Sequence, residues 1–431
     1  MKKVMVAGLA AFAAAAFGLS AHAATIAQVI VRQQWPWSTD VKVEYSLTGV
    51  DAAHPVNLTV TAYNGDAPLD SSRLRSAIKG DLYGITEEFG EFYIDPIAAF
   101  GSERIAMTKF KVKLAVSDSA ANLNDVLYKI FCLTNDIVTD VTRKDLINGR
   151  WGTVETDFSK IGDGFNTTLS DVIIWTGVTN DAKYATTHLV MRKIPAENVT
   201  WSMGARADDV AYGKAGSGLR HDVTLTQDYF IGVFPVTQRQ YVLMTGFGNP
   251  SNFKNLPDSD SRPVETRKYN TVESADLPKI RAATGVPGFT LPTEAQWEFA
   301  CRAGTASELN SGKSLTAANA REVAWCTDNA NAETHPVGML APNAFGLYDM
   351  HGNVGEGCLD WYSASEPGYG DGAAVTDPTG PAADPDGSGK HVTRGGYYTL
   401  PGSNYFIGSP GRGSHDGTYR TYGFRLAFVC D

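Results

Sequence analysis

Cysteine and histidine are the side chains best suited to redox and metal chemistry, and this sequence spaces them far apart. No two of its five cysteines follow a C-x-x-C spacing, which would have predicted a zinc or dithiol site. The histidines beyond the first 23 residues form no H-x-H or H-x-x-x-H pair. We therefore interpret the cysteines as buried thiols or disulfide partners, with at least one left unpaired because their number is odd. The cysteines are Cys132, Cys301, Cys326, Cys358 and Cys430, and the histidines are His54, His188, His221, His335, His351, His391 and His415.

A stretch near the C-terminus is typical of a binding surface but holds no reactive group. It reads TRGGYYTLPGSNYF, from Thr393 to Phe406, and contains no cysteine, histidine or carboxylate. Tyrosine offers rigid contact area with one polar end, so the stretch favours recognition over catalysis. The alternative is that its tyrosines fill space beneath the glycine turn. The residues expected to line a binding cleft are Arg394, Tyr397, Tyr398, Tyr405, Phe406 and Tyr419.

The elements that must position these residues begin with a strand-rich N-terminal region. Residues 41–47, 56–62 and 110–116 alternate apolar and polar side chains with a period of two. This period predicts half-buried antiparallel strands, and we expect a β-sandwich-like accessory domain over residues 24–120. Residues 121–187 are interpreted as a connector that can add strands to either neighbour.

The C-terminal half changes to short, well-capped helices in a sequence dense in glycine, proline and aromatic residues. Each predicted helix begins with a capping box and ends before a glycine. Arg425, between apolar neighbours, is expected to be buried against Glu294 or Glu298, because a buried arginine needs a carboxylate partner. The boxes are Thr237 with Gln240 and Thr293 with Gln296, and the glycines are Gly246 and Gly304.

The first 23 residues have the pattern of a bacterial-type secretory signal peptide. Lys2 and Lys3 precede an apolar run that ends at Ala21-His22-Ala23, a small-x-small cleavage site. We expect cleavage after Ala23 and an exported chain, periplasmic or secreted, with no membrane span in the mature protein; a membrane anchor is the alternative. The formal net charge of -10 repels a phosphate backbone, so no nucleic-acid partner is expected.

Seven segments of the C-terminal half, in their order, resemble the sulfatase-modifying factor family, whose founding members are formylglycine-generating enzymes. The resemblance runs from about Thr187 to Val429 and implies that family's mixed α/β fold, which is related to C-type lectins. The expected fold class is therefore α+β, with the β-sandwich-like domain followed by a formylglycine-generating-enzyme-like domain over residues 188–431. The segments are FPVTQRQY, RPVE, LPTEAQWEFACRAGT, THPVG, NAFGLYDMHGNVGEGCLDW, TRGG and YGFRLAF.

The resemblance also bears on catalysis, because the family's enzymes hold a copper ion between two cysteine thiolates and oxidise a substrate cysteine. Counted from the second glycine of TRGG, those positions are Leu400 and Tyr405 in this sequence. Soft thiolates select Cu(I), and neither of these side chains can supply one. The resemblance therefore implies the fold without copper, and a pseudoenzyme rather than an active oxidase.

The same resemblance implies a structural calcium site within YDMHGNVGEGCLDW. The ligands carried over are the side chains of Asp349 and Glu356 and the backbone carbonyls of Gly352 and Val354. All four supply hard oxygen atoms, which Ca²⁺ requires. The alternative is a glycine-rich turn in which Glu356 makes hydrogen bonds only.

Three functions remain open at this stage. We favour an exported, non-catalytic protein whose cleft binds a peptide, a glycan or a partner protein. The second is a formylglycine-generating oxidase, or another oxidase on the same fold, with atypical catalytic residues. The third is a structural cell-envelope protein led by the N-terminal domain. Thiol-dependent copper binding would separate the second function from the first.

Overall fold

Contacts within the chain divide it into two units, and each is described by itself. One comprises residues 1–125 and 143–150, and the other comprises residues 126–142 and 151–431. The predicted signal peptide and Cys430 lie outside the described residues. The computed structural model describes residues 24–34, 38–52, 54–68, 74, 77–100, 109–118, 125–147, 151, 154–155, 173–212, 220–363, 373–409, 411–415 and 417–429.

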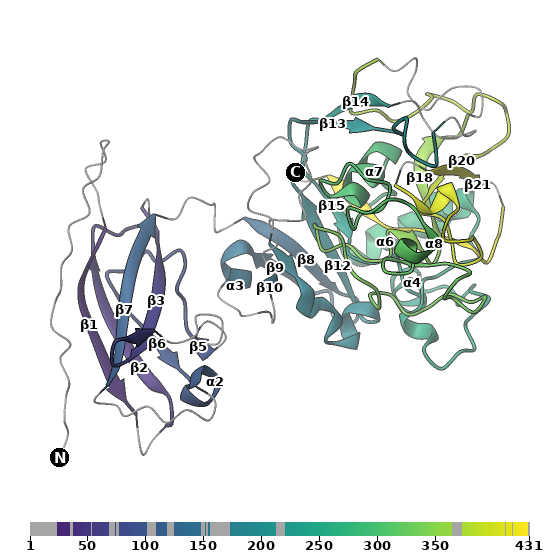
Figure 1. Ribbon diagram of the computed structural model, residues 1–431. Coiled ribbons are helices and arrows are strands. Elements are labelled where there is room, and N and C mark those ends of the chain that lie inside the picture. The colour runs from purple at the N-terminus through teal and green to yellow at the C-terminus, as the bar shows by residue number, and fades with distance from the viewer. Residues whose placement is uncertain are drawn as a thin grey trace. The chain divides into compact units, whose positions relative to one another are not determined.

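The first unit consists of two β-sheets (Figure 1), and they share one apolar core. The core takes alternate residues from both sheets, such as Val43 and Phe92 from one and Leu58 and Leu114 from the other, which confirms the sandwich-like class. The strand order is β1-β2-β6-β5 in one sheet and β4-β3-β7 in the other. The elements are β1 (Thr25–Gln33), β2 (Val41–Thr48), β3 (Val56–Asn64), β4 (Ala67–Pro68), β5 (Ile78–Lys79), β6 (Phe89–Ile94), β7 (Phe110–Asp118), α2 (Pro96–Phe100) and α3 (Arg143–Ile147).

A five-stranded antiparallel sheet organises the second unit, in the order β23-β15-β12-β8-β9. Both of its faces are apolar. Helix α7 contributes to the core on one face, and helices α4 and α6 contribute to the core on the other. Residues 126–142, within the predicted connector, form the last two strands of this sheet. The strands are β23 (Ala427–Val429), β15 (Tyr229–Gly232), β12 (His188–Ile194), β8 (Val126–Cys132) and β9 (Val138–Thr142).

Smaller sheets and short helices complete the second unit. The sheet orders are β21-β20-β18-β22, β13-β14-β19, β10-β11 and β16-β17. Their strands are β10 (Val154–Glu155), β11 (Ile174–Trp175), β13 (Val199–Met203), β14 (His221–Leu225), β16 (Ala324–Trp325), β17 (His351–Gly352), β18 (Gly355–Trp361), β19 (Val375–Thr376), β20 (His391–Arg394), β21 (Arg412–His415) and β22 (Tyr422–Gly423). The helical elements are η3 (Thr176–Thr179), η4 (Ala182–Ala185), α4 (Gln238–Thr245), η5 (Ser259–Ser261), α5 (Tyr269–Thr271), η6 (Val272–Asp276), α6 (Leu277–Thr284), α7 (Glu294–Arg302), α8 (Ala317–Ala320) and η7 (Tyr405–Ile407).

The two predicted capping boxes are confirmed at the starts of α4 and α7. In each, the threonine hydroxyl accepts the third backbone N–H and the glutamine side chain accepts the N–H of the cap, so two otherwise unpaired donors are satisfied. Helix α4 ends at Gly246 as expected. Helix α7 ends one residue earlier than Gly304, because Ala303 takes the left-handed conformation with φ of 44°. Within the described ranges, no helix is long and apolar enough to cross a membrane.

Candidate functional site

The chain turns sharply after β20, at Gly395 and Gly396. Both residues have positive φ values, 86° and 67°, in a region that favours glycine. A Cβ atom on Gly395 would lie 3.0 Å from the carbonyl oxygen of Met350, and one on Gly396 would lie 2.8 Å from Cδ1 of Ile407. Neither position has room for a side chain, so the turn requires glycine at both. The conformation of this turn sets where the aromatic segment leaves the sheet.

A buried network of charges joins this turn to helix α7. Arg394 Nε lies 3.1 Å from Glu294 Oε1, and Arg394 Nη2 pairs with Glu298. Arg412 Nε lies 2.9 Å from the same Glu294 oxygen, and Arg302 Nε donates to Glu298 at 2.8 Å. All five residues are at most 3% exposed. Burial opposes the charge of Glu298, but Arg394 and Arg302 hold its pKa below the ordinary value.

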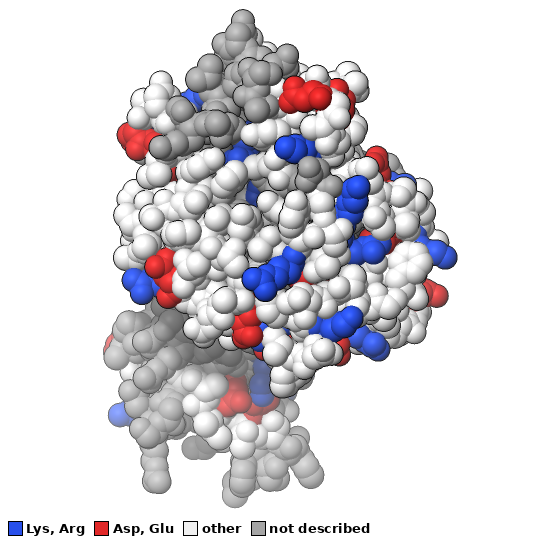
Figure 2. Space-filling view, turned by 90° about the vertical axis from the view of Figure 1, so that its right-hand side faces the viewer, with Lys and Arg blue, Asp and Glu red and all other residues white. Residues whose placement is uncertain are grey.

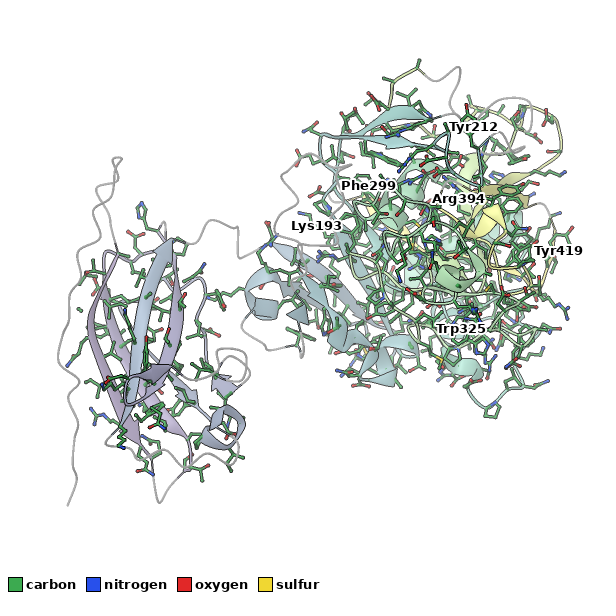
Figure 3. The ribbon with its side chains drawn as sticks, in the orientation of Figure 1. Lys193, Tyr212, Phe299, Trp325, Arg394 and Tyr419 are labelled. Carbon is green, nitrogen blue, oxygen red and sulfur yellow. The ribbon has the colours of Figure 1, made fainter. Side chains whose placement is uncertain are left out.

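Arg394 is therefore a structural residue, and its predicted place in a binding cleft is wrong. Its Nη1 donates to the carbonyls of Ser409 at 2.7 Å and Gly411 at 2.8 Å, and the residue is buried inside the larger unit, where Figure 3 labels it. Tyr398 is also fully buried, and its ring meets that of Phe253 edge-on at 5.6 Å. Neither side chain is accessible to a ligand.

The aromatic residues near the turn that reach the surface form two groups. Tyr397, Tyr419 and Tyr422 make up the tyrosine cluster, in which the ring of Tyr422 lies 5.5 Å from Tyr397 and 5.6 Å from Tyr419, edge-to-face in both pairs. Tyr419 is 50% exposed (Figure 3). Tyr405 and Phe406 form the second group, with their rings stacked at 4.6 Å. Sequence reasoning missed Tyr422. This residue lies three positions after Tyr419 and begins the segment YGFRLAF, and that spacing was a signal that could have found it.

Figure 2 shows the side of the larger unit on which Figure 3 labels Tyr419. Broad areas of this face carry no Lys, Arg, Asp or Glu side chain, and the charged side chains are scattered between them. Aromatic residues in a surface depleted of charge are typical of the central part of a protein interface. The tyrosine cluster contains two of the predicted cleft residues, Tyr397 and Tyr419, and both are at least partly exposed.

The two positions at which the resemblance places copper thiolates carry packed side chains. Leu400 packs against an apolar cluster that includes Cys326 and Ile407. The ring of Tyr405 stacks on Phe406, and burial raises the pKa of the Tyr405 hydroxyl. Since neither side chain can provide a thiolate, these positions do not fit Cu(I).

A buried cysteine and histidine lie side by side, but the pair is arranged as neutral groups. Cys301 Sγ is 3.7 Å from His351 Nε2 and 3.4 Å from Ser409 Oγ. Burial raises the pKa of Cys301 to about 12 and lowers the pKa of His351 to about 4. The His351 ring donates through Nδ1 to the Ile407 carbonyl at 2.6 Å and accepts the Asn310 N–H at 3.1 Å. These partners give the histidine a structural role and leave the thiol without a base to activate it.

The other described cysteines offer no copper site either. Burial raises the pKa of Cys358 and of Cys326. Cys132 is half-buried, and the hydroxyl of Thr134 lowers its pKa. Among the described residues the four cysteines are free thiols, and no three His, Cys, Asp or Glu side chains are grouped so as to hold a metal ion.

The segment predicted to bind calcium uses its carboxylates for contacts within the protein. Glu356 Oε2 accepts Arg425 Nε at 3.0 Å and the Trp297 indole N–H at 2.6 Å, and Glu356 Oε1 accepts Arg425 Nη2 at 2.9 Å. Asp349 accepts the Gly338 N–H at 2.8 Å. A cation placed here would face an arginine rather than open oxygen atoms, so the predicted ligand set, as arranged, does not fit Ca²⁺.

These contacts also correct the predicted partner of Arg425. Its carboxylate is Glu356, and not Glu294 or Glu298. The two glutamates of α7 instead face the β20–β21 hairpin, where Arg394 binds them both. The expectation that Arg425 is buried and paired with a carboxylate is confirmed. Which carboxylate it meets depends on how distant segments pack, and local sequence does not encode that packing.

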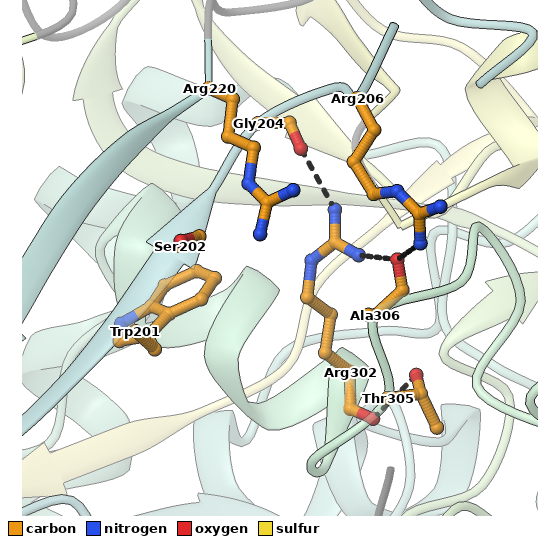
Figure 4. A pocket seen from close by; sticks show the side chains of 8 residues that line it. All are labelled: Trp201, Ser202, Gly204, Arg206, Arg220, Arg302, Thr305 and Ala306. Carbon is orange, nitrogen blue, oxygen red and sulfur yellow. Dashed lines mark hydrogen bonds between the residues drawn. The ribbon is translucent and has the colours of Figure 1, made fainter. Parts of the chain in front are cut away.

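A small polar pocket lies at the C-terminal end of α7 (Figure 4). Its volume is about 20 Å³, room for about one water molecule, and three of its lining residues are Arg206, Arg220 and Arg302. Arg302 donates to the Gly204 carbonyl at 3.1 Å, and Arg206 pairs with Asp208 at 2.7 Å. Two of the three guanidinium groups already bind protein acceptors. These bonds hold the end of α7 in place, and they leave the pocket poorly suited to binding an anion.

A model of the sulfatase-modifying factor enzyme 1-like domain matches residues 199–429. The sequence is 30% identical over 195 residues to the chaperone protein LppX of Paenibacillus barcinonensis, covering 34% of this chain and 66% of that protein. It is 34% identical over 157 residues to the formylglycine-generating enzyme of Streptomyces coelicolor, covering 33% and 48%. The chain therefore spans about half to two thirds of the length of these relatives.

Solved structures with a similar chain include Treponema denticola variable protein 1 and PvdO from Pseudomonas aeruginosa. The first is 26% identical, with a TM-score of 0.47, and covers 56% of this chain and 96% of that chain. The second is also 26% identical, with a TM-score of 0.43, and covers 56% and 94%.

Replacing Arg394 by methionine should destabilise the second unit by about 3–5 kcal/mol, because it leaves two buried carboxylates short of a partner. The control is Lys313→Met, since Lys313 pairs with Glu322, both side chains are 47% exposed, and such a surface pair is worth at most about 1 kcal/mol. Urea unfolding followed by tryptophan fluorescence measures both. Equal losses for the two variants would contradict a central role for the buried network.

Asp349 and His351 should give opposite pH dependences of stability. Burial raises the pKa of Asp349 to about 6, so its contribution is fully present below its unfolded pKa near 3.8 and is lost as pH rises through about 6. The pKa of His351 is lowered to about 4, so its contribution is present above its unfolded pKa near 6.5 and is lost as pH falls toward 4. Each slope amounts to at most about 1.4 kcal/mol per pH unit.

Single variants separate the two effects between pH 4 and pH 6. Relative to wild type, the unfolding free energy of Asp349→Asn should rise more steeply with pH, and that of His351→Gln should rise less steeply or fall. The measurement is urea unfolding at half-unit pH steps. Slopes parallel to wild type in both variants would show that these two groups do not titrate as described.

Proposed function

The chain belongs to the sulfatase-modifying factor enzyme 1-like family, and from that premise we propose that it is a non-catalytic member that binds a polypeptide. The observation that carries the proposal is the packing at Leu400 and Tyr405, where the family's enzymes need thiolates and this chain has an apolar contact and a stacked ring. The chemistry is absent, but the fold around it is kept. Binding is the activity that such a domain can still perform.

The tyrosine cluster is the proposed contact surface. Tyr397, Tyr419 and Tyr422 present ring edges and hydroxyl groups from two segments that the edge-to-face contacts hold together. Such rings give contact area at a low entropic cost, since a tyrosine has only two side-chain torsions to fix. Arg420 is exposed between two of these tyrosines in sequence and adds a donor for backbone carbonyls.

Two further observations support a polypeptide ligand outside the cytoplasm. One relative is named a chaperone protein, a class of protein that binds polypeptides. The first 23 residues have the charged start, apolar run and Ala-x-Ala end of an export signal. Export is part of the proposal, and N-terminal sequencing of the mature protein should find Ala24 first.

Tyr419→Ala should weaken binding of an unfolded polypeptide by at least about fivefold, as expected for an aromatic residue central to an interface. The probe is fluorescently labelled, reduced and carboxymethylated lactalbumin, which cannot refold, and its anisotropy reports binding. The double variant with Tyr397→Ala should lose more. Tyr212→Ala is the matched control, because Tyr212 is 51% exposed against 50% for Tyr419. Absence of binding by wild type, or equal affinities for all variants, would reject the proposal.

The reduced protein should bind no Cu(I) stoichiometrically and form no aldehyde on a Cys-x-Pro-x-Arg peptide, because soft thiolate ligands are missing where the family needs them. Competition with a Cu(I) chelator and mass spectrometry of the peptide measure these two properties. The double variant Leu400→Cys, Tyr405→Cys is the positive control and should gain Cu(I) binding. Aldehyde formed by the wild-type chain would establish the oxidase instead.

A further inference from the structure

The five-stranded sheet of the second unit carries a groove that is separate from the tyrosine cluster. Its volume is about 900 Å³, within the range of about 300–1,000 Å³ typical of small-molecule sites. It crosses the sheet face that α4 and α6 cover in part, beyond the end of α6. The described residues that line it are Lys129, Phe131, Val138, Phe230, Thr284, Gly285, Val286, Pro287, Gly288, Thr290, Phe428 and Val429.

Phenylalanine rings from three strands form the floor of the groove. Phe230 stacks on Phe428 at 4.9 Å, and Phe131 meets Phe428 edge-on at 6.3 Å. Above these nearly buried rings, the rim is apolar and open, since Val138 is 45% exposed and Val429 is 40% exposed. An apolar hollow with an exposed apolar rim on a folded domain is a feature that marks ligand or partner binding.

The wall of the groove is fixed before any ligand arrives. Residues 284–290 follow α6 through Gly285, whose φ of 71° ends the helix. The Arg281 side chain donates to the Phe289 carbonyl at 2.8 Å, and Thr290 exchanges two backbone hydrogen bonds of 2.8 Å with Ala427. A wall held at both ends keeps the hollow open, which lowers the ordering cost of binding.

Lys129 is the one charged side chain among the described residues that line the groove. Its ammonium lies 5.8 Å from the centre of the Phe230 ring and 2.8 Å from Asp140 Oδ1. The pair is partly exposed, with Lys129 at 29% and Asp140 at 45%, and such pairs contribute little to stability. The ammonium can therefore exchange Asp140 for a ligand carboxylate at small cost.

From this geometry we infer that the groove binds a small amphipathic acid, with its apolar body on the phenylalanine floor and its carboxylate at Lys129. A saturated chain of about ten carbons suits both the apolar lining and the single cation at one end. Burial of each methylene is worth about 0.8 kcal/mol, so the apolar body supplies most of the affinity and Lys129 selects the head group. This site is independent of the copper positions and of the polypeptide surface proposed above.

Titration calorimetry with decanoate, decanol and decyltrimethylammonium tests the inference on the full-length protein. Decanoate should bind to one site, decanol about tenfold more weakly, and the cationic amphiphile more weakly still. Lys129→Gln should reduce decanoate affinity about tenfold, to the level of decanol, and leave decanol unchanged. Val138→Glu, which places a negative charge on the rim, should weaken decanoate more than decanol.

Lys193→Gln is the matched control. Lys193 lies on the neighbouring strand β12, opposite Phe230 in the sheet (Figure 3), but it pairs with Asp228 at 3.0 Å and does not line the groove. It should bind decanoate as wild type does. Two results would overturn the inference. One is the absence of saturable decanoate binding below about 1 mM, which is on the order of the weakest useful affinity. The other is an equal affinity of Lys129→Gln and wild type for decanoate. Unchanged thermal unfolding confirms that the variants are folded.

Discussion

The buried ion network around helix α7 is the interaction on which the rest of the second unit depends. One short helix carries both carboxylates, and three arginines from its own last turn and from the β20–β21 hairpin converge on them. A charge buried alone costs several kcal/mol, so the helix and the hairpin are stable in this position only together. The glycine turn, the aromatic segment after it and the end of α7 all take their places from this arrangement.

The network is separate from the positions that carry copper in the family's enzymes. Leu400 and Tyr405 lie in the segment after the turn, where Leu400 packs against an apolar cluster and the ring of Tyr405 stacks on Phe406. The residues at these two positions can therefore differ from the family's cysteines without removing the interactions that hold the fold. A second buried ion pair joins Arg425 to Glu356 of β18. The sequence predicted that the Glu356 carboxylate holds a metal ion, and in the structure this carboxylate neutralises the arginine.

Features encoded over a few residues could be predicted from the sequence. The strands at 41–48, 56–64 and 110–118 follow from period-two alternation, and the capping boxes at Thr237 and Thr293 follow from a threonine and a glutamine three residues apart. The domain family followed from ordered motifs, because each motif marks a local constraint of the fold.

Features that join distant segments could not be predicted in the same way. The partner of Arg425, Glu356, lies 69 residues away, and the sequence prediction named only Glu294 and Glu298 as its partners. Arg394 was expected to line a binding cleft with the tyrosines that follow it, yet its environment is set by α7. The groove could not be predicted because its floor draws one phenylalanine from each of three strands, and local sequence does not encode the order of those strands in the sheet.

The hydrogen bonds between Thr290 and Ala427 have an effect beyond the groove wall. Strand β23 is the last strand on its side of the five-stranded sheet, and its outward-facing peptide groups are where another chain could pair. Thr290 occupies the N–H and the C=O of Ala427, so this border cannot template a foreign strand in full register. A single residue from an irregular segment thus blocks strand pairing at this edge of a sheet that carries several phenylalanine residues.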